Sequence, residues 1–175
     1  MVVKESTLTK LTITDVPNLD PINAIFEDYG PQRGKVIIEV CGDAWSYFWG
    51  AMGEQYAIKS FFLKAGTDYL VRKFKIGIDS TIDDDSQEAL QLKAKKEVIQ
   101  NRRFDGYSKH WARDKWDLID EISDCGKNEN SDILYEIFGE EWYSYLPQKP
   151  NPKYRHLCRI VDAIKEALRM PPNCV

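Results

Sequence analysis

A chain of 175 residues, 43% of them hydrophobic and 12% aromatic, is long and apolar enough to bury a core, which excludes a disordered protein. Its 24 Lys and Arg stand against 28 Asp and Glu, and this formal charge of −4 excludes the strongly basic class of dedicated nucleic-acid binders. No apolar run approaches the roughly 20 residues of a membrane helix, and the first residues lack the apolar segment of a signal peptide. We therefore expect a cytoplasmic protein with no membrane partner.

The first part of the chain has the alternation of apolar and polar residues that is typical of β-strands. The alternating runs are 8–15, 22–29 and 35–41. Turn-forming residues from Gly30 to Gly34 separate the second run from the third, so we expect a hairpin there. Every second residue from Val36 to Val40 is apolar, and this row should meet the core. The pattern predicts an antiparallel meander of about three strands.

The rest of the chain has helical spacing. We expect helices or helical turns around 56–62, 67–74, 85–98, 108–126, 132–145 and 157–168. Thr67 or Asp68 can cap the second of these, Asp85 can cap the third with Glu88 three residues on, and Ser108 can cap the fourth.

Strands first and helices afterwards predict an α+β fold, with several helices packed on one face of a small antiparallel sheet. The sequence has no internal repeat, no low-complexity tract and no Gly/Ser linker. We therefore expect a single domain over residues 1–175.

The segment 45–53 is unusually aromatic. In an extended backbone Trp45, Tyr47 and Trp49 share one side, and Ser46 and Phe48 share the other. Aromatic side chains on a sheet can stack on nucleic-acid bases, but they also fill cores, and we favour core packing.

A basic stretch runs from 93 to 113. On a helix, Lys93, Lys96 and Arg103 lie on one face, and Arg102, Lys109 and Arg113 continue the basic region. Such a patch could contact phosphate or an acidic protein. The acidic stretch from Asp114 to Glu141 follows it, so the alternative is an ordinary solvated face whose charges pair internally.

Catalytic motifs are lacking in this sequence. Its two histidines, His110 and His156, lie in no motif, and we expect surface or capping roles for both. Cys41 and Asp43 lie close to a serine, but no nucleophile spacing is present, and we expect Cys41 to be buried at a strand end. No glycine-rich phosphate-binding loop occurs.

Metal binding has little support in the sequence. The four cysteines, Cys41, Cys125, Cys158 and Cys174, are far apart and form no zinc motif, so we expect reduced thiols. The acidic run from Asp83 to Asp85 could attract Mg²⁺, but a cap role for Asp85 is the better interpretation. We expect no metal, no cofactor, no catalytic residue and no enzymatic activity.

Two segments, 34–53 and 150–160, resemble a group of small accessory proteins encoded by enterobacterial phages and prophages. The resemblance implies that the protein acts in the cytoplasm of an infected bacterium, and it supplies no catalytic residues. Small phage accessory proteins commonly bind a host or phage macromolecule, and inhibitors of restriction or CRISPR systems are a frequent class.

These observations favour a non-enzymatic phage protein that binds and inhibits a host macromolecule, for which a CRISPR or restriction complex is a candidate. The residues that we expect to contact the partner are Arg102, Arg103, Lys109, Arg113, Lys93, Lys96 and Trp49. The alternative is a nucleic-acid-binding accessory protein that uses the basic 93–113 region. An enzyme acting through Cys41, Asp43 or His156 ranks third, and the sequence leaves open whether the protein is a monomer or a homodimer.

Overall fold

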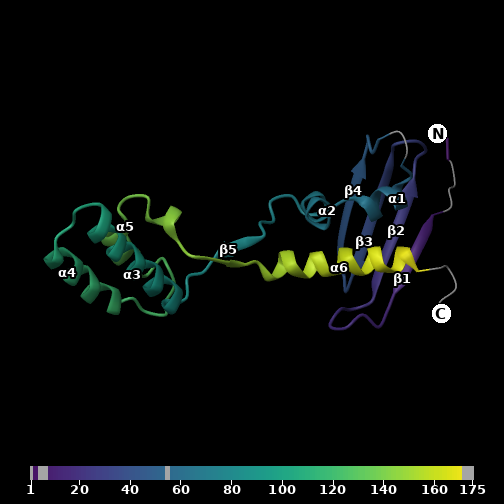
Figure 1. Ribbon diagram of the computed structural model, residues 1–175. Helices are drawn as coiled ribbons and strands as arrows, with labels where there is room; N and C mark the ends of the chain where they lie inside the picture. Colours follow the sequence, from purple (N-terminus) through teal and green to yellow (C-terminus); the bar gives the residue numbers. More distant parts are fainter. Residues whose placement is uncertain (1, 4–7, 54–55, 171–175) are drawn as a thin grey trace. The chain divides into compact units, whose positions relative to one another are not determined.

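The computed structural model describes residues 2–3, 8–53 and 56–170, and its fold is α+β, as expected (Figure 1). The chain forms two compact units, residues 1–80 with 152–175 and residues 81–151, which we call the sheet unit and the helical unit. Each unit contains its own cluster of buried apolar side chains. This division does not test whether the units unfold separately, so the single domain over 1–175 stays a prediction.

The sheet unit is built on four antiparallel strands in the order β1-β2-β3-β4. The strands are β1 (Thr9–Ile13), β2 (Ile22–Asp28), β3 (Gly34–Val40) and β4 (Asp43–Trp49). Ile22 lies opposite Val40, and Ile38 lies opposite Trp45. The aromatic segment supplies β4, so the meander has four strands where the sequence predicted about three.

Alternation along the strands separates a covered face from an open one. The buried side chains of the two central strands are Ile22, Ala24, Phe26, Val36, Ile38 and Val40. The predicted apolar row is therefore confirmed. Trp45 and Tyr47 also pack against this core, and Trp49 lies within it, which confirms core packing for the aromatic segment.

The loop between β3 and β4 corrects one prediction. It has two residues, Cys41 and Gly42, with φ of 48° and 90°, the left-handed conformations of a tight type I′ hairpin turn. The Cys41 side chain is exposed at this turn. The expectation of a buried cysteine at a strand end was wrong, because the strand ends one residue earlier.

Three helices pack against the sheet: α1 (Ile58–Lys64), α2 (Thr67–Phe74) and α6 (Pro152–Arg169) (Figure 1). The N-cap of α2 is Gly66, so the predicted caps Thr67 and Asp68 were wrong. Both residues instead tie α2 to α6. The Thr67 hydroxyl donates to Asp162 at 2.6 Å, and Asp68 accepts a hydrogen bond from the Tyr154 hydroxyl at 2.8 Å.

The helical unit contains α3 (Gln87–Phe104), α4 (Lys109–Asp120), α5 (Ser131–Phe138) and the 3-10 turn η1 (Trp142–Tyr145). Its first and last strands, β5 (Thr81–Asp83) and β6 (Gln148–Pro150), pair antiparallel. The buried side chains of this unit are Leu90, Ala94, Val98, Ile119, Ile122, Leu134, Ile137 and Leu146. Three helices therefore pack on the sheet, as expected, whereas α3, α4 and α5 bury their apolar stripes against one another.

The caps of the helical unit agree with the sequence at one helix and differ at another. The Trp111 N–H donates to the Ser108 hydroxyl oxygen at 3.0 Å, which confirms Ser108 as the cap of α4. The N-cap of α3 is Ser86, so the prediction of Asp85 was wrong. Among the described residues, no helix is long and apolar enough to span a bilayer.

Candidate functional site

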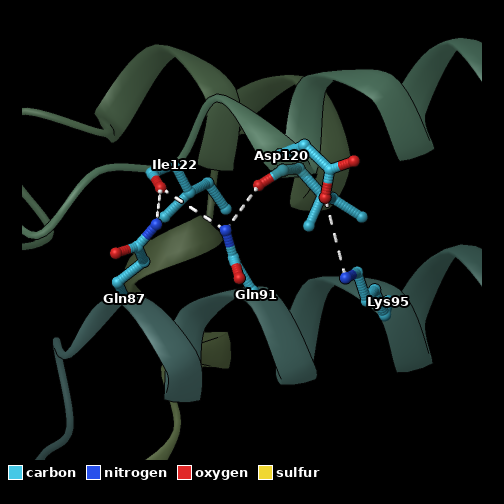
Figure 2. A network of polar contacts seen from close by, with 6 residues as sticks. Gln87, Gln91, Lys95, Asp120 and Ile122 are labelled. Atoms are coloured by element: carbon cyan, nitrogen blue, oxygen red, sulfur yellow. Dashed lines mark hydrogen bonds and ion pairs between the residues drawn. The ribbon is translucent and has the colours of Figure 1, made fainter.

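A polar network fixes the first half of α3 to the end of α4 (Figure 2). The Gln87 side-chain amide donates to the Ile122 carbonyl at 2.8 Å, and the Gln91 amide donates to the Ile119 carbonyl at 3.3 Å. The Ile119 carbonyl also accepts from the Ile122 N–H at 3.2 Å, and Ile122 lies just beyond the end of α4, so the two amides bind the turn that closes this helix. Lys95 adds an ion pair with Asp120 at 3.7 Å. The network therefore sets how α4 lies along α3.

The other half of the helix pair opens into a pocket of about 180 Å³. It is lined by Val98, Ile99 and Arg102 of α3 and by Lys109, Ala112, Arg113 and Trp116 of α4. A second hollow beside it is lined by Ile99, Arg102 and Arg103. The pocket thus has an apolar floor and a cationic rim.

Large apolar side chains stay exposed on these helices. Ile99 is 41% exposed, Trp116 is 37% exposed, and Phe104 at the end of α3 is 79% exposed. Tyr107 and Trp111 follow, with ring centroids 4.3 Å apart. An exposed apolar patch rimmed by polar residues is typical of an interaction site.

The charges of this surface are unbalanced. Within the described part of the chain, the four cations Arg102, Arg103, Lys109 and Arg113 form no ion pair. The helical unit as a whole has 10 Lys and Arg against 16 Asp and Glu, a formal charge of −6. Internal pairing, the alternative interpretation of the basic stretch, holds for Lys95, which lies 3.7 Å from Asp120, but not for these four cations.

The structure brings together four of the seven predicted contact residues, Arg102, Arg103, Lys109 and Arg113. Lys93 and Lys96 lie earlier on α3 and line neither hollow.

Trp49 does not belong to this surface. It is 3% exposed in the core of the sheet unit, where its indole N–H donates to the Tyr69 hydroxyl at 3.2 Å. A side chain so covered offers no surface to a partner, so its assignment as a contact residue was wrong.

Sequence reasoning missed the apolar part of the pocket. Trp116 of α4 was not singled out as a contact residue; its ring stays partly exposed, with the Lys95 ammonium 5.5 Å from the ring centroid. Ile99 was not singled out, although it directly follows the buried Val98 and so lies at the edge of the apolar stripe of α3. A large apolar residue beside a buried stripe, followed by two arginines, is the signal that could have identified it.

The candidate catalytic residues are dispersed. Asp43 and His156 line a pocket of the sheet unit, and Cys41 does not. His110 is exposed, and its Nε2 lies 3.5 Å from Asp114, in agreement with a surface role. Cys125 is exposed and free, and burial raises the pKa of the half-buried Cys158 thiol. Cys174 lies outside the described residues.

Lysines hold two of the acidic residues considered for Mg²⁺. Asp83 accepts hydrogen bonds from Lys127 and Gln148, and Asp84 accepts one from Lys149 at 3.1 Å. These bonds lower the pKa of both carboxyl groups. In the described ranges, no group of three or more His, Cys, Asp or Glu side chains is placed to hold a metal ion.

Residues 1–170 match the model of a protein family that is described as a phage family. Neither a curated protein nor a solved structure matches the chain significantly. The family model covers both units, including the whole of α3 and α4.

Proposed function

The chain belongs to this phage family, and we propose that it acts without catalysis, by binding and inhibiting a macromolecule of the host bacterium. The observation that carries the proposal is the pocket between α3 and α4, where cations that form no ion pair among the described residues line the same hollow as the exposed side chains of Ile99 and Trp116. A defence complex of the CRISPR or restriction type is the target that we favour, because a phage gains directly from blocking it.

A protein partner suits this surface better than a nucleic acid does. Binding hot spots commonly combine an apolar anchor in a small pocket with arginines around it. The floor of the pocket accepts such an anchor, and Arg102 and Arg113 lie where they can pair with carboxylates beside it. The formal charge of −6 on the helical unit would repel a long polyanion. The expected partner surface is therefore acidic, with one protruding apolar side chain.

The test is capture of partners from a nuclease-treated bacterial lysate by the tagged protein and by an Arg102→Glu/Arg113→Glu variant. We expect the wild-type chain to retain a stoichiometric protein that the variant loses. The control is Lys59→Glu/Lys96→Glu, which makes the same charge change at two exposed lysines outside the pocket. Equal capture by wild type and both variants, or no stoichiometric protein at all, would contradict the proposal.

Inhibition needs its own readout, because binding alone does not establish it. Bacteria that carry a defence system and express the wild-type chain should plate a sensitive phage more efficiently than bacteria that express Arg102→Glu/Arg113→Glu. Equal plating with the two proteins across CRISPR and restriction strains would contradict a counter-defence role.

Nucleic-acid binding through the 93–113 region is the second candidate. It is supported by the four unpaired cations and by the neighbouring rings of Tyr107 and Trp111, which resemble the mixture of charge and stacking used on single strands. Fluorescence anisotropy with single- and double-stranded oligonucleotides tests it. The affinity should fall steeply between about 50 and 200 mM salt, because cations that bind phosphates displace counterions and added salt opposes this release. Lys96→Glu and Arg102→Glu should each weaken the binding of the oligonucleotides. No binding at the lower salt concentration would exclude this second function.

A further inference from the structure

The outer edge of β4, which we call the β4 edge, is the less protected of the two edges of the sheet (Figure 1). Proteins commonly blunt an edge strand by keeping it short or by placing lysine or proline on it. β1, at the other edge, has five residues and carries the exposed Lys10. β4 has seven residues, pairs with β3 without a bulge, and contains no lysine, arginine or proline. The β4 edge is therefore able to accept a further strand.

The backbone groups that point outward from β4 follow from the register of the sheet. The Tyr29 N–H donates to the Arg33 carbonyl at 3.0 Å, one pair beyond the ends of β2 and β3. Hydrogen-bonded pairs alternate with other pairs along an antiparallel ladder, so the odd-numbered residues of β3 bond to β2 and the even-numbered ones bond to β4. Each even-numbered residue of β3 lies opposite an odd-numbered residue of β4. The N–H and carbonyl groups of Ala44, Ser46 and Phe48 therefore point away from the sheet.

A pocket of about 620 Å³ lies beside the same edge, within the sheet unit. Asp43 and Trp45 of β4 form part of its wall, and the other lining residues come from the end of α2 and the start of α6: Lys75, Pro152, Lys153, His156 and Leu157. Side chains alternate along a strand, so Asp43 and Trp45 share the covered face. The pocket therefore lies on the covered side of the β4 edge.

The pocket suits an uncharged side chain. The ring of Trp45, together with Pro152 and Leu157, supplies apolar wall. The charges of Asp43 and Lys75 are opposite, and Lys153 already has an interaction partner within the protein. The lining charges thus give an ion little advantage, whereas indole and aliphatic walls pack well against aromatic or large aliphatic side chains.

The edge and the pocket fit the same ligand, an extended peptide segment. A segment that runs antiparallel to β4 would exchange main-chain hydrogen bonds with Ala44 and Ser46. Its residue opposite Trp45 would occupy a non-hydrogen-bonded position, where the side chains of two strands come closest. That side chain would lie on the covered face beside Trp45, where the pocket is. Main-chain bonds would supply affinity, and the pocket would select the residue.

We propose that an extended segment of a partner protein adds as a strand to the β4 edge, with an aromatic or large aliphatic side chain in the pocket beside Trp45. The site shares no residue with the α3–α4 pocket, so it does not depend on the function proposed above. Its residues belong to the sheet unit, and a variant of one site leaves the other intact.

The experiment is an NMR titration of the full chain with blocked peptides of the sequence Thr-Thr-Lys-X-Lys-Thr-Thr, in which X is Trp, Leu, Asp or Lys. The residues that flank X would face the open side of the sheet, where lysines keep the peptide soluble. We expect saturable shifts at residues 44–46 with X as Trp or Leu, and an affinity about tenfold weaker or worse with Asp or Lys. The amides of Ala44 and Ser46 should also exchange more slowly with solvent once the peptide is bound.

N-methylated peptides test whether the contact is strand pairing. A methyl group on the nitrogen of either residue that flanks X removes an N–H that would donate to β4, and it should weaken binding about tenfold. A methyl group on the nitrogen of X removes an N–H that points away from β4, so the affinity should change little. Equal effects of the methyl groups at these positions would overturn the proposal.

Two proline variants test the edge from the side of the protein. Ser46→Pro removes an outward N–H without removing a bond to β3, and it should weaken binding about tenfold. Thr12→Pro is the matched control, because the same alternation points the Thr12 N–H outward from β1. Unfolding midpoints identify any folding defect, and the N-methylated peptides test the wild-type chain if Ser46→Pro does not fold.

Three further results would overturn the proposal. The first is the absence of saturable shifts at about 1 mM with X as Trp and as Leu. The second is equal binding by folded Ser46→Pro and Thr12→Pro. The third is a dimer in sedimentation whose Ala44 and Ser46 amides are protected without peptide, because a second copy would then occupy the β4 edge.

Discussion

The two units of this protein differ in how many side chains they bury in a common core. Among the described residues, 19 buried side chains form the core cluster of the sheet unit, whereas 8 form that of the helical unit. Polar groups of the sheet unit are used for internal contacts: the Lys165 ammonium, for example, is buried and donates to the Ala65 carbonyl at the end of α1 at 2.5 Å. In the helical unit, Arg102 and Arg113 line one open pocket together with the partly exposed ring of Trp116. The sheet unit thus has the larger core, and the contact surface that we propose for the host macromolecule belongs to the helical unit.

The contrast has a physical origin in the number of layers. In the sheet unit, three helices cover one face of a four-stranded sheet, so each apolar row has a partner. In the helical unit, the buried stripe of α3 meets only two further helices, and residues at its edge, such as Ile99, stay partly exposed. Apolar area left in water stabilises nothing within the fold, which is why its position beside unpaired cations points to a partner.

The largest effect is expected in the core of the sheet unit. Phe62 is fully buried, with its ring edge-on to Phe26 at 5.6 Å. Phe62→Ala should lower the free energy of unfolding by about 3–5 kcal/mol, because it removes buried contacts and leaves a cavity. Chemical denaturation measures the loss, and amide hydrogen exchange locates it.

The same variant tests the predicted single domain. If residues 1–175 unfold as one cooperative unit, the most protected amides of α3 and α4 should lose as much protection as those of β2 and β3. Unchanged protection in α3 and α4 would contradict a single domain.

A smaller effect is expected where the sheet approaches α1. A Cβ added to Gly34 would lie 2.6 Å from the Ile58 Cβ, closer than such atoms approach in proteins. Gly34→Ala should therefore cost about 1–3 kcal/mol of stability through overpacking. Gly50→Ala is the matched control, since the added atom there makes only an ordinary contact, 3.5 Å from the Phe48 ring. Equal unfolding midpoints for the two variants would contradict overpacking, because they would show that α1 shifts to accommodate the added methyl group at no cost in stability.

The features that could be predicted from the sequence are those that depend on local pattern. Burial along the strands follows a strict period of two, so the apolar row from Val36 to Val40 could be identified from local pattern alone. Ser108 was identified for the same reason, because a cap depends only on the residues next to it. Asp84 shows the limit: it is held by Lys149, which is 65 residues away, and no local pattern encodes that contact.

Part of the candidate site could also be predicted from the sequence. The run of basic residues gave Arg102, Arg103, Lys109 and Arg113, because charge can be read directly from the sequence. It could not separate them from Lys93 and Lys96, since the half of α3 that opens depends on how α4 is fixed by Gln87 and Gln91. Trp49 and Trp116 look alike in sequence, and only long-range packing buries the first and exposes the second.

The polar network of the helical unit gives the next prediction. Gln87→Met keeps the length and apolar volume of the side chain but removes the donor to the Ile122 carbonyl. It should cost about 1 kcal/mol, the typical net value of one hydrogen bond. Gln100→Met, at an exposed position of the same helix, is the control. Equal stability of the two variants would mean that the network contributes nothing to the position of α4.

Acid should weaken the helical unit at its first and last strands. Hydrogen bonds from Lys127 and Lys149 lower the pKa of Asp83 and Asp84 from their ordinary value of 3.8. Because these pKa values are lower in the folded state, the stabilisation is complete above that value and is lost as the pH falls through the folded values. Exchange of the β5 and β6 amides should rise more between about pH 5 and pH 2 in the wild type than in Lys127→Met/Lys149→Met. The same increase in exchange in the wild type and in the variant would show that these ion pairs do not cause the loss of stability in acid.

The smallest effect on stability is expected at the surface proposed to bind the partner. Arg102 is exposed and has no ion pair among the described residues, so Arg102→Glu should change the free energy of unfolding by less than about 0.5 kcal/mol. Lys115→Glu provides the contrast. The Lys115 side chain is 14% exposed and lies 2.5 Å from Glu136, so its reversal puts two carboxylates together at a partly covered position.

The comparison of these two reversals decides what the cations are for. Reversing the charge of a cation that supports the fold, as we expect for Lys115, lowers the stability of the protein. Reversing a cation that serves a partner lowers only the affinity for that partner. Thermal unfolding of the two variants measures the first property, and partner capture measures the second. If Arg102→Glu destabilises the protein as much as Lys115→Glu does, the basic rim belongs to the fold, and the contact surface that we propose in the helical unit fails at its central residue.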